Sequence, residues 1–335
     1  DGGFTEVGAL AGISDDTVIA FAAQFVDLNG DYYPELIIAG DFGSSRYYRN
    51  EGDGTFTDQT LASGTGREAN GMGIAVADLN GDGLLDWYVT SVSTRWPIYR
   101  TPGTGNALYL NQGNDRFVDV AHDAQVREGG WGWGVEAIDL NHDGLRDIVT
   151  TTGWIEPNGA ELYEWEGQPT FLFFGTGTNA NGLPSFSRAN AATIGLRHRL
   201  QGRALLSIDY DSDGDRDIVI FNYDSRPSLF RNDLGGLDGP SATPSTHWLR
   251  VFLDTSQESR LAPHGWGATV TVVANGRSQQ AAMTTGGFFG ASELSIHFGL
   301  GELAEIEELV VDWPDGRKTI LYGVATNQTL TIRPH

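Results

Sequence analysis

Four stretches of this chain repeat one acidic pattern, and a short apolar run follows each of them. The stretches are DLNGDYYPE at 27–35, DLNGDGLLD at 78–86, DLNHDGLRD at 139–147 and DYDSDGDRD at 209–217. Each places oxygen-bearing side chains at positions 1, 3, 5 and 9 of a nine-residue loop. Carboxylates this close together repel one another, so they converge stably only around a cation.

Oxygen ligands without His or Cys select calcium over softer metals, and a flexible loop suits calcium better than the strict octahedron of magnesium. We therefore expect about four Ca²⁺ ions, one in each loop. The predicted side-chain ligands are Asp27, Asn29, Asp31 and Glu35, then Asp78, Asn80, Asp82 and Asp86, then Asp139, Asn141, Asp143 and Asp147, and finally Asp209, Asp211, Asp213 and Asp217. The backbone carbonyls at position 7 are further predicted ligands, by analogy with the EF-hand loop, and belong to Tyr33, Leu84, Leu145 and Asp215.

Two other interpretations compete with this one. The fourth loop begins like an EF-hand, but its position 12 is Ile220 rather than Glu, and its flanks are β-branched rather than helical. The loops could also be solvated Asp/Gly turns that bind nothing. Four copies in register argue against that interpretation.

The repeat extends beyond the loops and predicts an all-β fold. A strand rich in small residues precedes each loop, and two or three further strands follow it. Four-stranded antiparallel units at this period are typical of propeller blades, in which small residues suit the crowded innermost strand. The opening residues 2–7 match the outermost strand alone, which predicts that they complete a blade begun by the C-terminal part of the chain.

The sequence pattern of the chain changes near residue 240, after which the acidic loops no longer occur. We predict calcium-binding blades over 1–240 and a second segment, without acidic loops, over 241–335. This second segment keeps strand signals, and Trp313–Arg317 has the Pro and Gly of a hairpin turn. It must add either further blades or a separate sandwich, and we favour further blades that close a ring of seven.

The loops with their trailing Asn-x-Gly-Asp-Gly-x-Phe turns resemble VCBS/FG-GAP repeats, as in integrin-type propellers. The residues His297–Gly301, Val311–Arg317 and Asn327–Leu330 resemble an ASPIC/UnbV segment. Together the similarity covers nearly the whole chain and points to a cartilage acidic protein-like family. The resemblance implies a calcium-binding β-propeller, in a family whose members are mostly exported or extracellular. One departure is Pro263–Ala268, where His264 and Trp266 replace a small Gly-Ala-rich turn and either contact a ligand or pack locally.

The composition of the chain narrows the classes of partner that it can bind. The formal net charge is −23, which argues against nucleic acid and anionic membranes. Cysteine is absent, and no apolar run approaches the roughly 18 residues of a membrane span. Since such loops usually need extracellular calcium levels, we expect an extracellular or periplasmic location. The start at Asp1 without Met suggests a processed terminus.

Catalytic motifs are missing, with no zincin pattern, P-loop or nucleophile elbow. The best candidates in the long inserts are Glu156 and His198, and His264 of the C-terminal segment is a further candidate. Trp131 and Trp133 alternate with Gly on an inner strand, which favours packing between blades. We favour a non-enzymatic module that binds a protein or a glycan. The alternative is a lyase, cyclase or hydrolase that takes a small molecule at the mouth of the propeller axis.

Overall fold

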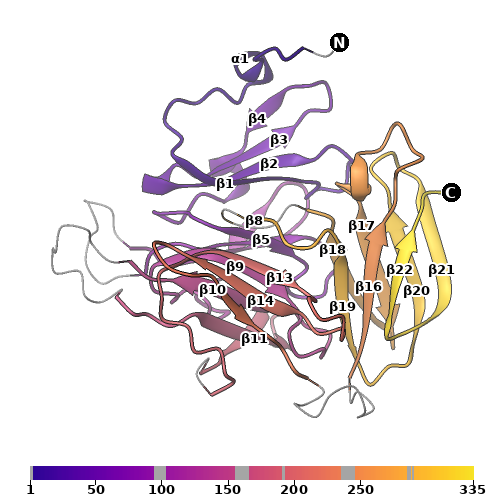
Figure 1. Ribbon diagram of the computed structural model, residues 1–335. Coiled ribbons are helices and arrows are strands. Elements are labelled where there is room, and N and C mark those ends of the chain that lie inside the picture. The colour runs from indigo at the N-terminus through magenta and orange to yellow at the C-terminus, as the bar shows by residue number, and fades with distance from the viewer. Residues whose placement is uncertain are drawn as a thin grey trace.

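The computed structural model describes residues 3–93, 103–154, 166–190, 193–234, 246–284, 288 and 290–335. All four acidic loops lie within these ranges, and each joins two antiparallel strands of one sheet (Figure 1). The strands follow one another in chain order within each sheet. This is the strand–loop–strand unit that the sequence predicts.

The four sheets and the short helices beside them have the following bounds. The first sheet contains β1 (Ala20–Val26), β2 (Glu35–Gly40), β3 (Arg46–Asn50) and β4 (Phe56–Asp58). The second contains β5 (Ile74–Ala77), β6 (Asp86–Val89), β7 (Ala107–Asn111) and β8 (Phe117–Asp119). The third contains β9 (Gly132–Ile138), β10 (Asp147–Thr152), β11 (Phe171–Thr178) and β12 (Pro184–Arg188). The fourth contains β13 (Gly202–Ile208), β14 (Asp217–Asn222) and β15 (Ser228–Phe230). The helices are α1 (Gly8–Ala11), η1 (Asp41–Gly43) and α2 (Thr60–Ser63).

Successive sheets pack face to face through shared apolar layers. In β6, Trp87 belongs to the layer with the first sheet, whereas Tyr88 belongs to the layer with the third. In β10, Ile148 faces the second sheet and Val149 faces the fourth. Neighbouring residues of a strand point to opposite faces, so both faces of these strands are buried. This burial explains their unbroken apolar sequences, and it is the packing expected of propeller blades.

Glycines on the innermost strands allow those strands to approach closely. A Cβ atom on Gly134 of β9 would lie 2.5 Å from the carbonyl oxygen of Arg203 in β13. A Cβ atom on Gly73, just before β5, would lie 2.4 Å from the carbonyl oxygen of Trp133. The predicted role of small residues at the crowded inner edge is therefore confirmed.

The C-terminal segment forms two further sheets. One contains β19 (Ile296–Gly301), β16 (His247–Leu253) and β22 (Gln328–Ile332). The other contains β18 (Arg277–Ala282), β17 (Thr269–Ala274), β20 (Glu305–Asp312) and β21 (Lys318–Ala325), with the short helix η3 (Pro263–Gly265) before β17. The predicted hairpin turn at Trp313–Arg317 joins β20 to β21, and the Trp313 N–H donates to the Arg317 carbonyl at 2.9 Å.

These two sheets differ from the further blades that we expected. They share one apolar core, to which β16 contributes Leu249, β17 contributes Val270 and β20 contributes Leu309. In addition, β16 pairs in parallel with β22, whereas a blade is a meander of consecutive antiparallel strands. The segment is therefore a sandwich in its described part.

The predicted seven blades are not present in the described ranges, which hold four blade-like sheets and this sandwich. Residues 3–7 form no strand, and Phe4 is fully exposed, so the opening segment does not complete a blade here. The predicted domain boundary after residue 240 lies outside the described residues. Blade number and ring closure stay predictions.

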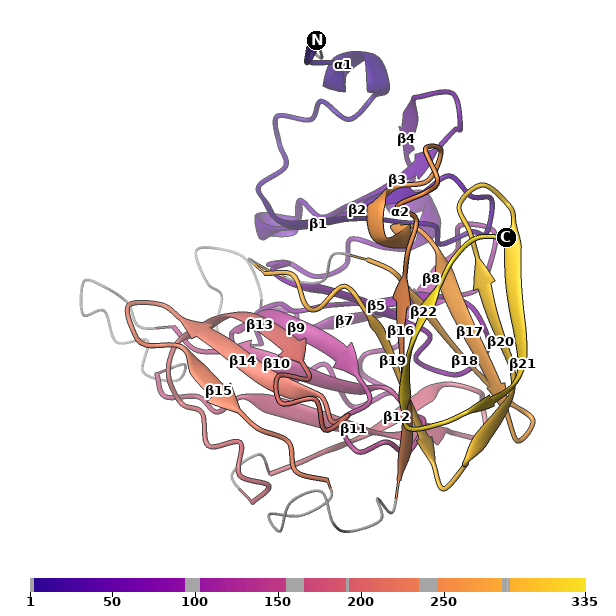
Figure 2. The same ribbon diagram turned by 45° about the vertical axis from the view of Figure 1, so that its right-hand side comes forward.

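The sandwich stands beside the blades on the side of the acidic loops (Figures 1 and 2). The Gly301 N–H donates to the carbonyl of His142 in the third loop at 2.7 Å. The Tyr32 hydroxyl of the first loop lies 3.4 Å from Asp312. The loops are therefore at the contact between the two parts of the chain.

Asn111, at the end of β7, links two adjacent blades. Its side-chain amide donates to the carbonyl of Leu85 in its own blade at 3.0 Å and to that of Leu28 in the preceding blade at 2.8 Å. The equivalent Asn50 of the first blade donates only within its own blade, to Pro34 at 3.0 Å. The two asparagines make the same second side-chain hydrogen bond, because the side-chain oxygen of each accepts the backbone N–H of the glycine two residues later in the chain.

This difference gives a test of the packing between blades. We expect Asn111→Ala to lower the free energy of unfolding by about 1 kcal/mol more than Asn50→Ala, because it also leaves the buried Leu28 carbonyl without its donor. Urea unfolding of both variants measures the difference. Equal losses would show that the bond between the blades adds nothing to stability.

Candidate metal centres and their contact with the sandwich

One hydrogen-bond scheme recurs in all four loops. The carboxylate at position 1 accepts the backbone N–H groups of positions 5 and 6, the carboxylate at position 5 accepts that of position 7, and the carboxylate at position 9 accepts that of position 2. The bonds from position 6 to position 1 join Tyr32 to Asp27 at 2.8 Å, Gly83 to Asp78 at 3.0 Å, Gly144 to Asp139 at 2.8 Å and Gly214 to Asp209 at 3.2 Å. The loop backbone is therefore folded around the carboxylates at positions 1, 5 and 9, which are three of the predicted ligand positions.

The backbone at positions 4 and 6 is left-handed in every loop. The angle φ lies between 58° and 80° at position 4 and between 71° and 97° at position 6. Glycine adopts this conformation without strain, and it fills five of the eight positions. Tyr32, His142 and Ser212 adopt it at some cost, which indicates that the loop geometry is retained against local preference.

The carboxylate at position 9 also ties its loop to the third strand of the blade. A second oxygen of Asp86 accepts the N–H of Asn111 at 2.8 Å, and Asp217 accepts that of Asn232 at 2.8 Å. Asp147 accepts the N–H of Gly175 at 2.9 Å. These carboxylates are fully buried, so their position is set by the blade as much as by the loop.

Burial makes charge costly at these positions. It raises the pKa of Glu35 to about 8, that of Asp147 to about 8, that of Asp139 to about 7 and that of Asp217 to about 6. Neighbouring carboxylates raise the pKa values further, as Asp27 does for Glu35. Such a cluster is stable in its charged form when a cation compensates it.

The donor set fits a hard divalent cation. In the fourth loop, oxygen atoms of Asp209, Asp211 and Asp217 all lie within 4.8 Å of one another. In the second and third loops, the amide at position 3 donates to the carboxylate at position 5, from Asn80 to Asp82 at 2.8 Å and from Asn141 to Asp143 at 3.0 Å. All these ligands are oxygens, which is the chemistry of calcium rather than zinc or copper.

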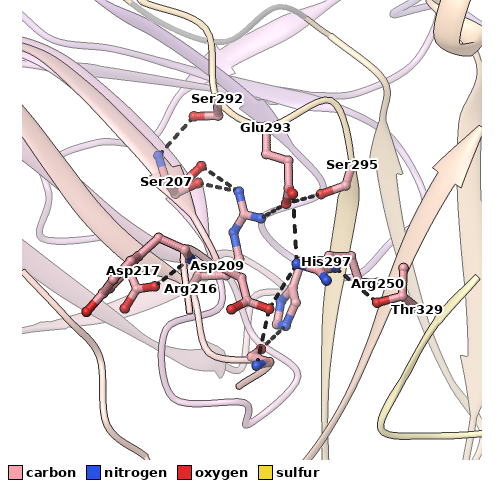
Figure 3. Close-up of polar contacts among 12 residues, drawn as sticks. Ser207, Asp209, Arg216, Asp217, Arg250, Ser292, Glu293, Ser295, His297 and Thr329 are labelled. Atoms are coloured by element: carbon pink, nitrogen blue, oxygen red, sulfur yellow. Dashed lines mark hydrogen bonds and ion pairs between the residues drawn. The ribbon is translucent and has the colours of Figure 1, made fainter. Parts of the chain in front are cut away.

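The fourth loop also contacts the sandwich closely (Figure 3). Arg250 of β16 approaches Asp209 at 2.9 Å, and the ring of His297 in β19 lies 3.1 Å from the carbonyl oxygen of Gly214. A Cβ atom on Gly214 would lie 2.0 Å from the Trp248 ring, so only glycine fits there. This contact could not be predicted from the sequence, because its partners are far apart in the chain.

Arg216 forms the second link between the fourth blade and the sandwich (Figure 3). One guanidinium nitrogen lies 2.7 Å from Glu293, in the segment that leads into β19, and another donates to the carbonyl of Ser207 at 2.7 Å. Ser292 accepts the N–H of Ser207 at 3.0 Å. Because Arg216 is buried, this ion pair replaces water as the partner of both charges.

Two histidines meet at the same contact. The rings of His142 and His297 lie 4.9 Å apart, one in the third loop and one in β19. Burial lowers the pKa of His142 to about 4 and lowers that of His297 well below its usual value. Both rings are therefore neutral at pH 7, and the approach of His142 to Asp215 at 3.8 Å is not an ion pair. The only hint in the sequence was His in place of Gly at position 4 of the third loop.

The structure does not bring the catalytic candidates together. His198 is buried between blades, where its ring nitrogens contact Thr170 at 3.1 Å and Asn222 at 2.8 Å. His264 is exposed within η3 of the sandwich, and Glu156 lies outside the described residues. His198 is thus a packing residue that joins the third blade to the fourth.

Aromatic side chains fill the ends of the inner strands that point away from the acidic loops. Trp131 and Trp133 are buried and stacked with centroids 6.2 Å apart, which confirms the predicted packing role. Phe288, from the segment between β18 and β19, packs on Trp133 at 5.5 Å. Arg203 lies over the same ring at 4.0 Å.

Comparison with known families agrees with this architecture. A model of FG-GAP-like repeats matches residues 27–89 and 98–150, and a model named ASPIC and UnbV matches residues 258–335. The mouse protein "Cartilage acidic protein 1" is 24% identical over 346 aligned residues, which cover 99% of this chain and 46% of that protein. The human protein of the same name is 25% identical over 312 residues, which cover 89% of this chain and 41% of that protein.

The chain carries FG-GAP-like repeats and an ASPIC/UnbV domain and is homologous to cartilage acidic protein 1. It spans less than half the length of these relatives. No helix in the described part of the chain is long and apolar enough to span a membrane.

Two solved structures show weaker similarity. The biofilm matrix protein Bap1 of V. cholerae gives a TM-score of 0.25 at 16% identity and covers 90% of this chain and 48% of its own. The Tc holotoxin pore of Photorhabdus luminescens gives a TM-score of 0.30 at 17% identity and covers 89% of this chain and 12% of its own. Scores this low carry no argument about function.

The buried ion pair between the blades and the sandwich gives a second test. We expect Arg216→Met to lower the free energy of unfolding by about 3 kcal/mol, because the partly buried Glu293 loses its closest cationic partner and keeps Arg250 at 3.8 Å. Arg333→Met is the control, since that arginine pairs with Asp254 at an exposed position and should cost less than about 1 kcal/mol. Similar losses in urea unfolding of the two variants would contradict the assignment.

Proposed function

We propose that this chain is a calcium-stabilised interaction module that acts outside the cytoplasm and binds a protein or glycan partner. The combination of FG-GAP-like repeats with an ASPIC/UnbV domain points to an interaction or adhesion module. The observation that carries the calcium part is the hydrogen-bond scheme shared by four loops, in each of which the position 9 carboxylate is buried and the position 1 carboxylate is buried or half-buried.

In this proposal each loop holds one ion through its side-chain oxygens at positions 1, 3, 5 and 9 and its carbonyl at position 7. The ion, when bound, supplies positive charge and no reaction step. The residues of the chain orient the ligands, through backbone N–H groups within the loop and through the third strand at position 9. Because the ligands meet only in the folded chain, binding adds directly to the free energy of unfolding.

The proposed location outside the cytoplasm has two supports. Homology to cartilage acidic protein 1 is consistent with export. Loops of this type are also suited to the high calcium concentrations outside the cytoplasm. We propose no reaction, because the described residues do not assemble His198 and His264 into one site.

Chelation tests the structural role of the metal. We expect excess EDTA to lower Tm by about 10 °C or more, since several sites lose their contribution to stability together. Added Ca²⁺ should restore Tm, and equimolar Mg²⁺ should restore less of it, as differential scanning fluorimetry would show. An unchanged Tm would contradict a structural role for calcium.

A single ligand substitution tests the assignment of the sites. We expect Asp86→Asn to lower the number of bound calcium ions from about four to about three, because a charged ligand of one loop is lost. Asp123→Asn removes the same charge from an exposed position outside the loops and should leave the number unchanged. Native mass spectrometry counts the ions, and equal counts in both variants would refute this site.

A further inference from the structure

One stretch of this acidic chain has the opposite charge. Residues 167–208 contain no Asp or Glu, although the chain has 44 acidic residues in total. The stretch carries Arg188, Arg197, Arg199 and Arg203, as well as His198. Clustered arginines are a typical feature of sites that bind anions.

The fold places Arg197 and Arg199 in the connection before β13, at the end of the blades that lies away from the acidic loops, whereas Arg188 is the last residue of β12. Strands β9 and β13 run toward their loops, so Gly132 and Gly202 mark the far ends of these blades. Strand β14 runs back from its loop and ends at Asn222. His198 contacts Thr170 and Asn222 and thereby fixes the connection between β12 and β13 at this far end.

Two adjoining cavities follow this connection, and we call them together the arginine groove. The first has a volume of about 500 Å³ and includes Arg188, and the second has a volume of about 620 Å³ and includes Arg226. Both are lined by Arg197, His198 and Arg199. Volumes of this size are typical of sites for small ligands.

Three arginines of the groove differ from those described arginines that pair with carboxylates. Arg188, Arg199 and Arg226 are exposed and form no ion pair within the described residues. Arg199 donates to the carbonyl of Gly167 at 2.9 Å, and the guanidinium of Arg188 lies over the Phe171 ring at 3.9 Å. Elsewhere the described arginines commonly pair with carboxylates, as in Arg46, Arg49, Arg127, Arg216, Arg231, Arg250, Arg317 and Arg333. The positive charge of Arg199 and Arg226 is therefore available to a ligand.

We propose that the arginine groove binds a short acidic oligosaccharide. Carboxylate or sulfate groups of the sugar pair with Arg199 and Arg226, and the apolar faces of its rings lie against Leu229 and Phe230. The net charge of −23 disfavours a long polyanion and favours a short or terminal one. This inference rests on the proposed function, since it names the partner of the interaction module.

Two proline residues favour a sugar over an extended peptide. Pro169 lines the first cavity and Pro227 the second. Proline has no N–H group, so neither wall offers at that position the backbone donor that an added peptide strand requires. Recognition in the groove therefore depends on side chains, as is usual for charged sugars.

Isothermal titration calorimetry on the calcium-loaded chain in about 150 mM NaCl tests this proposal. The probes are a hexagalacturonate, a sulfated heparin hexasaccharide, neutral cellohexaose and a hexa-aspartate peptide. We expect at least one acidic sugar to bind and cellohexaose not to bind. The two acidic sugars distinguish carboxylate from sulfate as the recognised group. Binding of hexa-aspartate alone would overturn the sugar class.

Matched variants locate the binding. We expect R199E/R226E to weaken binding of the acidic sugar by about tenfold or more, because attraction becomes repulsion at two positions. The control R260E/R277E makes the same change of charge at exposed positions of the C-terminal segment and should change Kd by less than about twofold. Equal weakening in both double variants would overturn the site.

The calcium dependence of Tm, measured on the same samples, separates this inference from the proposed function. If neither acidic sugar binds while EDTA still lowers Tm, the groove proposal is overturned and the calcium-stabilised module stands. A preserved Tm in R199E/R226E shows that lost binding is not lost folding. The milder R199Q/R226Q should weaken binding less than the Glu variant, as expected for a charge contact.

Discussion

The fold depends on placing buried carboxylates close together without letting their repulsion open the blades. Backbone N–H groups at positions 2, 5, 6 and 7 of each loop donate to these carboxylates, and the same pattern recurs four times. Such bonds offset part of the cost of burial, and the proposed calcium ions would offset the rest. The first two strands of each blade are held in register by this arrangement, because the loop joins them directly.

The contact between the blades and the sandwich builds on the same loops. Arg250 pairs with Asp209, and Arg216 pairs with Glu293. The His297 ring contacts the backbone carbonyl of Gly214 rather than a side chain. Neutral histidines pack where a charge would be costly. The C-terminal sheets therefore contact the third and fourth loops directly. We expect the docking of these sheets to depend on the two loops being formed.

Local features of the fold could be predicted from the sequence, whereas pairings between distant segments could not. The loop pattern placed β13 and β14 correctly. The Pro and Gly within Trp313–Arg317 identified the hairpin turn between β20 and β21. The parallel pairing of β16 with β22 joins residues that are 79 positions apart, and no local signal marks it. For this reason the sequence leaves both further blades and a separate sandwich open for the C-terminal segment, and the described part of that segment forms a sandwich. The absence of acidic residues over 167–208 was visible in the sequence, but its meaning required the contact of His198 with Asn222.

The contact at Gly214 has a consequence for thermodynamic linkage. If an ion in the fourth loop favours the docked arrangement of the sandwich, then docking must favour that ion by the same factor. Any macromolecule that holds β16 and β19 in place would then tighten the metal, and any that pulls them away would release it. The two parts of the chain would thus respond to calcium and to a partner as one reciprocal system.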